Sequence, residues 1–178
     1  MKKLKEHIIL YDAACPMCDL YTRGFQKAGM LDENGRMPYQ DIPATIACSV
    51  NRDRFVNEIA LVNSSTGKVY YGVESLLQII THSIPFLKPL AQNKAFLFFV
   101  NKLYKVVSFN RRVILPAVKK EMQVPAFDPS FNARCRVIYM AFSLFLSAVV
   151  LHQYSFCLGA ILPASSFGRE LLICSGQL

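Results

Sequence analysis

The sequence lacks tryptophan, contains only three histidines and has no second copy of its one Cys-x-x-Cys pair. It shows no nucleic-acid-binding motif, so nucleic acid is not an expected partner. The N-terminus lacks the apolar stretch and small-residue cleavage site of a signal peptide. We therefore expect a cytoplasmic location, where a Cys-x-x-Cys pair is redox-active or metal-binding before it is structural.

Acidic residues are scarce in the second half of the chain. Residues 1–90 carry ten Lys and Arg against nine Asp and Glu, whereas residues 91–178 carry ten against three. The formal net charge of +8 therefore lies almost wholly in the second half, where it flanks long apolar runs. This arrangement favours an anionic membrane surface as a partner, and a solvated basic face is the alternative.

The first half of the chain shows the patterns of short strands and amphipathic helices. In chain order they predict a strand at 7–11, a helix at 16–30, a strand at 36–42, a short helix around 44–50, a hairpin of 58–62 and 68–71, and a helix at 73–82. This order, βαβ followed by ββα, is that of an α/β fold with a thioredoxin-like core. We assign residues 1–116 to this domain, with additional helices following at the C-terminus.

Residues 94–109 also have a helical pattern, but they are apolar on nearly all sides. Such a helix is either buried or lies against lipid. Residues 117–136, which contain two prolines, read as a linker, and residues 137–178 form a hydrophobic helical segment.

The hydrophobic segment leaves two interpretations open. Residues 137–151 carry no charge but are shorter than the ~20 residues that span a bilayer, whereas residues 137–162 suffice if His152 and Gln153 are tolerated. In that case Arg134 and Arg136 would anchor the cytoplasmic end, and the protein would be tethered to the cytoplasmic face of a membrane. The alternative is a soluble helical subdomain packed on the core.

The motif Cys15-Pro16-Met17-Cys18 stands between the first strand and the first helix. Pro16 suits the first helical position because its missing N–H is not needed there. At the cap, unsatisfied backbone N–H groups and the helix dipole favour a Cys15 thiolate, and Cys18 one turn later can resolve a mixed disulfide. The pattern predicts Cys15 as the attacking thiol and Cys18 as the resolving thiol, with the disulfide itself as redox group and no further cofactor.

Zinc binding is the structural alternative for the two cysteines. A closed zinc site needs four ligands, and the remaining candidates are scattered singly along the chain: Cys48, Cys135, His7 and His82. Asp12, three residues before Cys15, either accepts N–H bonds in the turn or relays a proton to and from Cys18. Tyr11, Tyr21 and Phe25 are expected to serve packing.

Three ordered blocks of the sequence resemble the DCC family of thiol–disulfide oxidoreductases. The first is Tyr11-Asp12-x-x-Cys15-Pro16-x-Cys18, the second joins residues 68–72 to 74–77, and the third joins Tyr104 to Asn110-Arg111. Together they cover about residues 7–112. The resemblance implies a thioredoxin-like fold, exchange with protein or small-molecule thiols and disulfides, and catalytic roles for Asp12, Cys15 and Cys18.

Two departures from the expected pattern concern the site. Ala13 stands where the family usually has glycine, which would be strained if the position needs a positive φ. Thioredoxins also present a cis-proline just before the third strand, on the backbone edge that holds a substrate cysteine, and residues 54–58 contain no proline. That edge must therefore be built differently, or the substrate is not a thioredoxin-type protein.

Tyr104 and Arg111 are further candidates for the site, binding a substrate or an anion, and Arg111 could also lower a thiol pKa. The alternative, which the sequence favours, is that Arg111 and Arg112 cap the C-terminal end of the 94–109 helix. A second function also stays open: a non-enzymatic, membrane-anchored binding module with structural or zinc-binding cysteines.

Overall fold

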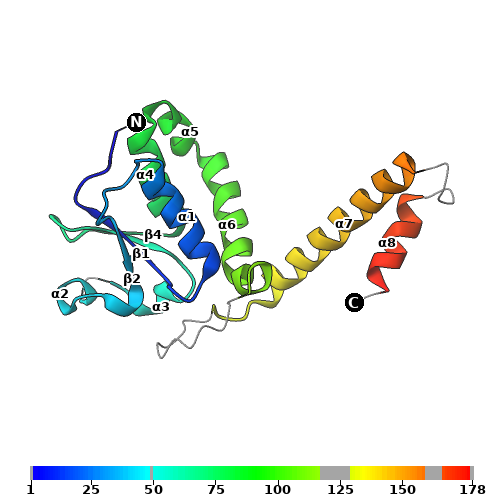
Figure 1. The fold of residues 1–178 in the computed structure, drawn as a ribbon, viewed down its shortest axis with the longest axis horizontal. Coiled ribbons are helices and arrows are strands. Elements are labelled where there is room, and N and C mark those ends of the chain that lie inside the picture. Colours follow the sequence, from blue (N-terminus) through cyan, green and yellow to red (C-terminus); the bar gives the residue numbers. More distant parts are fainter. Residues whose placement is uncertain (1, 49, 117–128, 159–165, 177–178) are drawn as a thin grey trace. The chain divides into compact units, whose positions relative to one another are not determined.

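The computed structural model describes residues 2–48, 50–116, 129–158 and 166–176. The chain forms two compact units, Met1–Phe131 and Asn132–Leu178 (Figure 1). The first unit holds the sheet and all the predicted site residues, and the second consists of helices. Each unit is described by itself.

The first unit is built on one mixed four-stranded sheet. Its elements are β1 (His7–Tyr11), α1 (Pro16–Lys27), β2 (Arg36–Pro38), η1 (Tyr39–Asp41), α2 (Ala44–Ala47), α3 (Arg52–Phe55), β3 (Ala60–Asn63), β4 (Val69–Tyr71), α4 (Gly72–Ser83), η2 (Pro85–Leu87), α5 (Lys88–Gln92) and α6 (Lys94–Ile114). The strand order is β2-β1-β3-β4. Strands β1 and β2 are parallel, and the other two pairs are antiparallel. The predicted α/β class with a thioredoxin-like core is confirmed.

Alternating side chains of the strands fill a separate core on each face of the sheet. On one face, Ile9 and Leu61 lie in a cluster that includes Ile79 of α4, with Tyr21 and Phe25 of α1 packed against it. On the other face, Leu10 lies with residues of β3 and with Tyr39 of η1. The two-residue period of the strands thus buries both faces of the sheet. The end of β1 is followed directly by the turn that leads into α1.

Several element boundaries differ from the prediction, among them the ends of β2 and α6. The predicted strand at 36–42 ends at Pro38, which lacks the N–H needed to continue a ladder, and η1 follows. The predicted helix at 94–109 continues to Ile114. The short helix α3, which begins after the Asn51 cap, was not predicted.

Helix α6 is neither wholly buried nor wholly apolar toward the core. Phe98 and Phe99 are about two-thirds exposed, at 67% and 66%, whereas Ser108 and Arg111 are buried. The inward face is polar because it packs on the backbone that precedes β3, whose N–H and carbonyl groups require hydrogen-bond partners.

The second unit consists of α7 (Ala133–Cys157) and α8 (Phe167–Ser175). The two helices pack together, with the rings of Phe145 and Phe167 5.8 Å apart. Helix α7 is long and apolar enough to cross a membrane, and only 6% of its most apolar window is buried. Residues 133–136, predicted as linker, are the first turn of α7. Most of the predicted linker, residues 117–128, and the end of the predicted span, residues 159–162, lie outside the described residues.

Candidate active site

The turn between β1 and α1 places Cys15 at the N-cap of α1. The Cys15 N–H donates to the Asp12 carbonyl at 3.0 Å, and the Ala14 N–H donates to Asp12 Oδ1 at 3.0 Å. This is an Asx turn, so the expected turn-capping bond of Asp12 is present. Cys15 has extended backbone angles, Pro16 occupies the first helical position, and the Cys18 N–H donates to Cys15 Sγ at 3.4 Å.

The strain expected at Ala13 is absent. In the described part of the chain, Glu6 is the only residue other than glycine with a positive φ. The turn therefore accommodates a Cβ at this position without entering the left-handed region.

The Asp12 carboxylate is completely buried, and it is paired with two arginines. Arg111 Nη2 lies 3.5 Å and Arg112 Nη2 lies 3.1 Å from Asp12 Oδ2. The Gln40 amide donates to Oδ1 at 3.4 Å. A buried carboxylate requires this kind of compensation, since an unpaired charge would be costly away from water.

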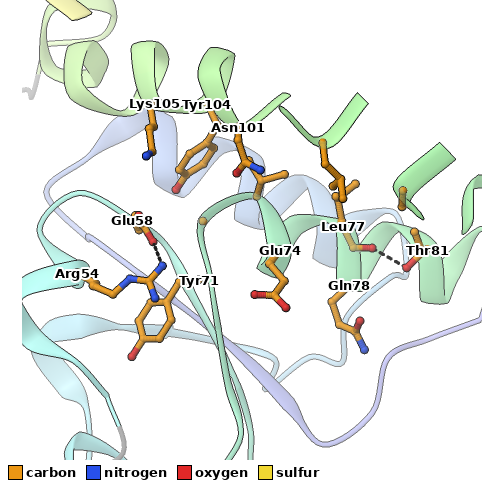
Figure 2. A pocket seen from close by; sticks show the side chains of 14 residues that line it. Arg54, Glu58, Tyr71, Glu74, Leu77, Gln78, Thr81, Asn101, Tyr104 and Lys105 are labelled. Carbon is orange, nitrogen blue, oxygen red and sulfur yellow. Dashed lines mark hydrogen bonds and ion pairs between the residues drawn. The ribbon is translucent and has the colours of Figure 1, made fainter. Parts of the chain in front are cut away.

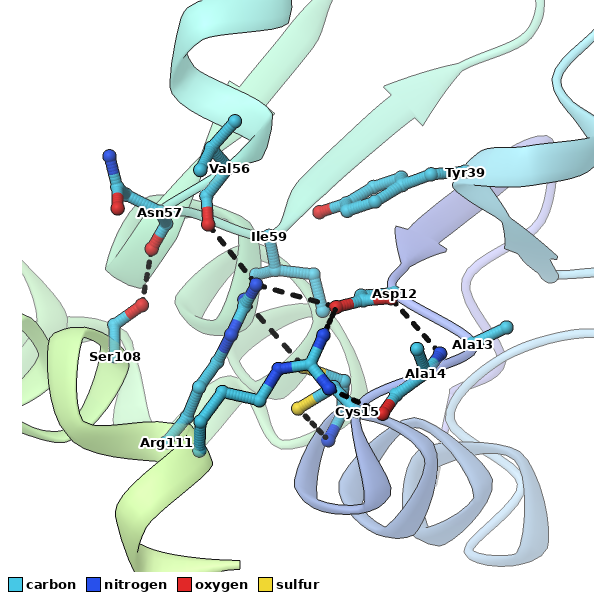
Figure 3. Close-up of polar contacts among 12 residues, drawn as sticks. Asp12, Ala13, Ala14, Cys15, Tyr39, Val56, Asn57, Ile59, Ser108 and Arg111 are labelled. Carbon is cyan, nitrogen blue, oxygen red and sulfur yellow. Dashed lines mark hydrogen bonds and ion pairs between the residues drawn. The ribbon is translucent and has the colours of Figure 1, made fainter. Parts of the chain in front are cut away.

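Arg111 joins the carboxylate to the dithiol and to the backbone before β3 (Figure 3). Its Nη1 lies 3.9 Å from Cys18 Sγ, and its Nη2 donates to the Val56 carbonyl at 3.1 Å. Arg112 donates to the Ala14 carbonyl at 2.9 Å. Arg111 and Arg112 lie in the last turn of α6, where the favoured interpretation as helix caps expects them, but their side chains reach the Val56 carbonyl and the Asp12–Cys15 turn.

The surroundings set the two thiols far apart in acidity. The pKa of Cys15 falls from 9.0 to about 6, chiefly because the Cys18 side chain and N–H donate to its sulfur and Arg111 lies nearby, against burial and the Asp12 charge, which raise it. The pKa of Cys18 is strongly raised, first by its hydrogen bond to Cys15 and then by burial. One thiol is thus a thiolate at neutral pH, and the other keeps its proton.

Tyrosine side chains surround the dithiol in different roles. Tyr21, three residues after Cys18 in α1, packs against the core as predicted. Burial raises the pKa of Tyr104 to about 12, and its hydroxyl accepts the Ile59 N–H at 3.0 Å. Tyr104 therefore contacts the backbone before β3 through this hydrogen bond.

Sequence reasoning missed two residues of this site, Gln40 and Arg112. Gln40 and Arg112 reach Asp12 from 28 and 100 residues away in the chain, and no local pattern marks them.

A separate cavity of about 530 Å³ lies beside Tyr104, between α4 and α6 (Figure 2). Its lining includes both positive and negative side chains. Among them, Arg54 and Glu58 form an ion pair with 2.6 Å between Nη2 and Oε2. Neither Cys15 nor Cys18 lines it. Within the described residues, no group of three or more His, Cys, Asp or Glu side chains is arranged to hold a metal ion.

Comparison with known proteins bears on this geometry. No curated protein and no solved structure matches the chain significantly. Residues 9–116 match the profile of the DCC1-like thiol-disulfide oxidoreductase family. The match spans the sheet, the Cys15–Cys18 turn and the arginines at the end of α6. The chain accordingly belongs to the DCC1-like thiol-disulfide oxidoreductase family.

Proposed function

We propose that the protein is a dithiol–disulfide oxidoreductase in which Cys15 attacks and Cys18 resolves. The observation that carries the proposal is the acid thiol at the N-cap of α1, with its sulfur accepting the Cys18 N–H. An isolated thiol would be mostly protonated at neutral pH, whereas this one is ionised. The disulfide is the redox group, so the reaction needs no other cofactor.

The reaction follows from the different acidity of the two thiols. The Cys15 thiolate attacks one sulfur of a disulfide RS–SR, forms Cys15–S–SR and releases RS⁻. Cys18 then attacks the Cys15 sulfur, expelling the second RS⁻, which takes up the Cys18 proton. The protein loses two electrons as its disulfide forms, and the substrate disulfide gains them. The reverse sequence oxidises a dithiol substrate.

Asp12 and Arg111 serve as positioning residues in this proposal. Arg111 approaches the Cys18 sulfur, and Asp12 holds the guanidinium in place. The proton relay suggested for Asp12 stays a prediction, as does anion binding by Arg111 and Tyr104.

The pH dependence of thiol alkylation tests the ionisation of Cys15. We expect the rate of iodoacetamide modification at Cys15 to rise with pH around a midpoint near 6, because alkylation needs the thiolate and the folded-state pKa is about 6. Mass spectrometry of the reduced protein at each pH gives the rate, with Cys15→Ser as the blank. A midpoint near the ordinary 9.0 would contradict the proposal. Cys18→Ser should accumulate the mixed disulfide on Cys15.

We also propose that α7 associates with a membrane. At 25 residues the helix is about 37 Å long, enough for the ~30 Å hydrocarbon layer. Large apolar side chains are exposed along it, including Phe142, Phe145 and Phe156. Arg134 and Arg136 at its first turn favour the cytoplasmic side for that end.

Fractionation of cells that express the full chain tests this association. We expect the protein to stay in the membrane pellet after alkaline carbonate extraction, because an apolar helix of this length is not released by loss of charge pairing. A peripheral and an integral protein of the same membranes serve as controls. A pool released entirely with the peripheral control would remove α7 from the bilayer.

A further inference from the structure

The backbone segment before β3 has its hydrogen-bonding groups occupied by the chain itself. The Asn57 and Glu58 N–H groups donate to the Arg54 carbonyl at 3.1 and 2.8 Å, and the Ile59 carbonyl accepts from Gly72 at 2.9 Å. The Glu58 carbonyl accepts from Tyr39 at 3.0 Å.

Side chains on one face of α6 bind further N–H and carbonyl groups of this backbone segment. Tyr104, Ser108 and Arg111, spaced like successive turns of one helix face, bind the Ile59 N–H, the Asn57 carbonyl and the Val56 carbonyl, respectively. Ser130 donates two hydrogen bonds of 2.9 Å to Asn57 Oδ1, one from its N–H and one from its hydroxyl. An extended polypeptide pairs with backbone N–H and carbonyl groups that are free to bind it, and here side chains of α6 occupy the Ile59 N–H and the Asn57 and Val56 carbonyls.

The dithiol is also closed to solvent in this state. Cys15 is 0% exposed and Cys18 5% exposed. The Arg112 side chain is 17% exposed. It donates hydrogen bonds to the Ala14 carbonyl and to Asp12 Oδ2, both in the turn before Cys15. It is the more exposed of the two arginines that pair with Asp12, and turning its side chain outward breaks its bonds to Ala14 and Asp12 without moving the backbone of α6.

We propose, resting on the function above, that α6 occupies the backbone groups before β3 with which an extended polypeptide would otherwise pair, and that the Cys15–Cys18 pair exchanges with low-molecular-weight disulfides admitted past Arg112. The substrate class is a small disulfide or dithiol that needs no backbone pairing. Tyr104, Ser108 and Arg111 exclude extended polypeptides by occupying their place. Exchange follows the two steps given above, with the small disulfide as RS–SR.

Two matched oxidants test the substrate class on the reduced full chain in detergent. One is hydroxyethyl disulfide, and the other is an extended ten-residue peptide whose single cysteine carries the same mercaptoethanol group. We expect the small disulfide to form the Cys15–Cys18 bond at least about tenfold faster, because the peptide must wait for local opening of α6. Equal rates, or a faster peptide, would overturn the proposal while leaving the oxidoreductase function standing.

Arg112→Ala tests the route of entry. We expect this variant to react about threefold or more faster with hydroxyethyl disulfide, with the pH midpoint of Cys15 near 6, because Cys18 and Arg111, which lower the Cys15 pKa, stay in place. Lys105→Ala, on an exposed position of α6, is the matched control. An unchanged or slower rate in folded Arg112→Ala, verified by circular dichroism, would contradict entry past Arg112. If a large excess of hydroxyethyl disulfide forms neither a Cys15 mixed disulfide nor a Cys15–Cys18 disulfide in wild-type protein, the proposed function itself is wrong.

Discussion

Asp12→Asn is expected to destabilise the protein while making Cys15 more acidic. The asparagine keeps an oxygen for the Ala14 N–H but removes the charge that the buried Arg111 and the partly buried Arg112 guanidinium groups face. Breaking a buried ion pair from one side costs about 3 kcal/mol of unfolding free energy. The Asp12 charge also raises the pKa of Cys15, so its removal should move the alkylation midpoint below 6.

Urea unfolding and the alkylation profile measure the two effects separately. Asp32→Asn is the matched control, because Asp32 pairs with Lys3 at an exposed position and at 3.6 Å, where an ion pair contributes little. If Asp12 serves only to cap the turn, the asparagine should be nearly neutral in both measurements. If Asp12 also relays the Cys18 proton, release of the second thiol in the Cys18 step should slow in the variant even though Cys15 reacts readily.

Arg111→Gln is expected to lose both stability and thiol activation. The Arg111 side chain is 5% exposed, and its guanidinium contacts Asp12, Cys18 and the Val56 carbonyl. Its loss leaves the Val56 carbonyl without this donor and Asp12 with one guanidinium, at a cost of about 3 kcal/mol. Because the Arg111 charge lowers the pKa of Cys15, the variant's alkylation midpoint should move above 6.

The same substitution should lower the reduction potential of the Cys15–Cys18 pair. A stabilised thiolate favours the dithiol form, so its loss shifts the equilibrium toward the disulfide. Titration in dithiothreitol redox buffers measures this shift, and Arg111→Lys, which keeps the charge, should recover part of it. A midpoint and potential equal to those of the wild type would show that Arg111 contributes only to folding.

The sequence by itself determined the redox turn and the order of elements around it. The apolar run of β1, Pro16 after Cys15 and the helical spacing that follows are local signals, because each depends on residues close in the chain. The same local logic gave turn capping as one of two roles for Asp12, and it predicted the hairpin that leads to α4. Three short blocks in the same order then matched the family over a large part of the domain.

Only the tertiary structure decided what surrounds the Cys-x-x-Cys pair. Arg111 and Arg112 reach Asp12 across 99 and 100 residues, and such long-range contacts leave no period in the sequence. The same packing turns a polar face of α6 onto the backbone before β3, where thioredoxins carry a proline and this sequence has none. The absence of tryptophan and of a second Cys-x-x-Cys pair limited the possible sites, but the closing of the dithiol by a distant helix follows from how the chain packs.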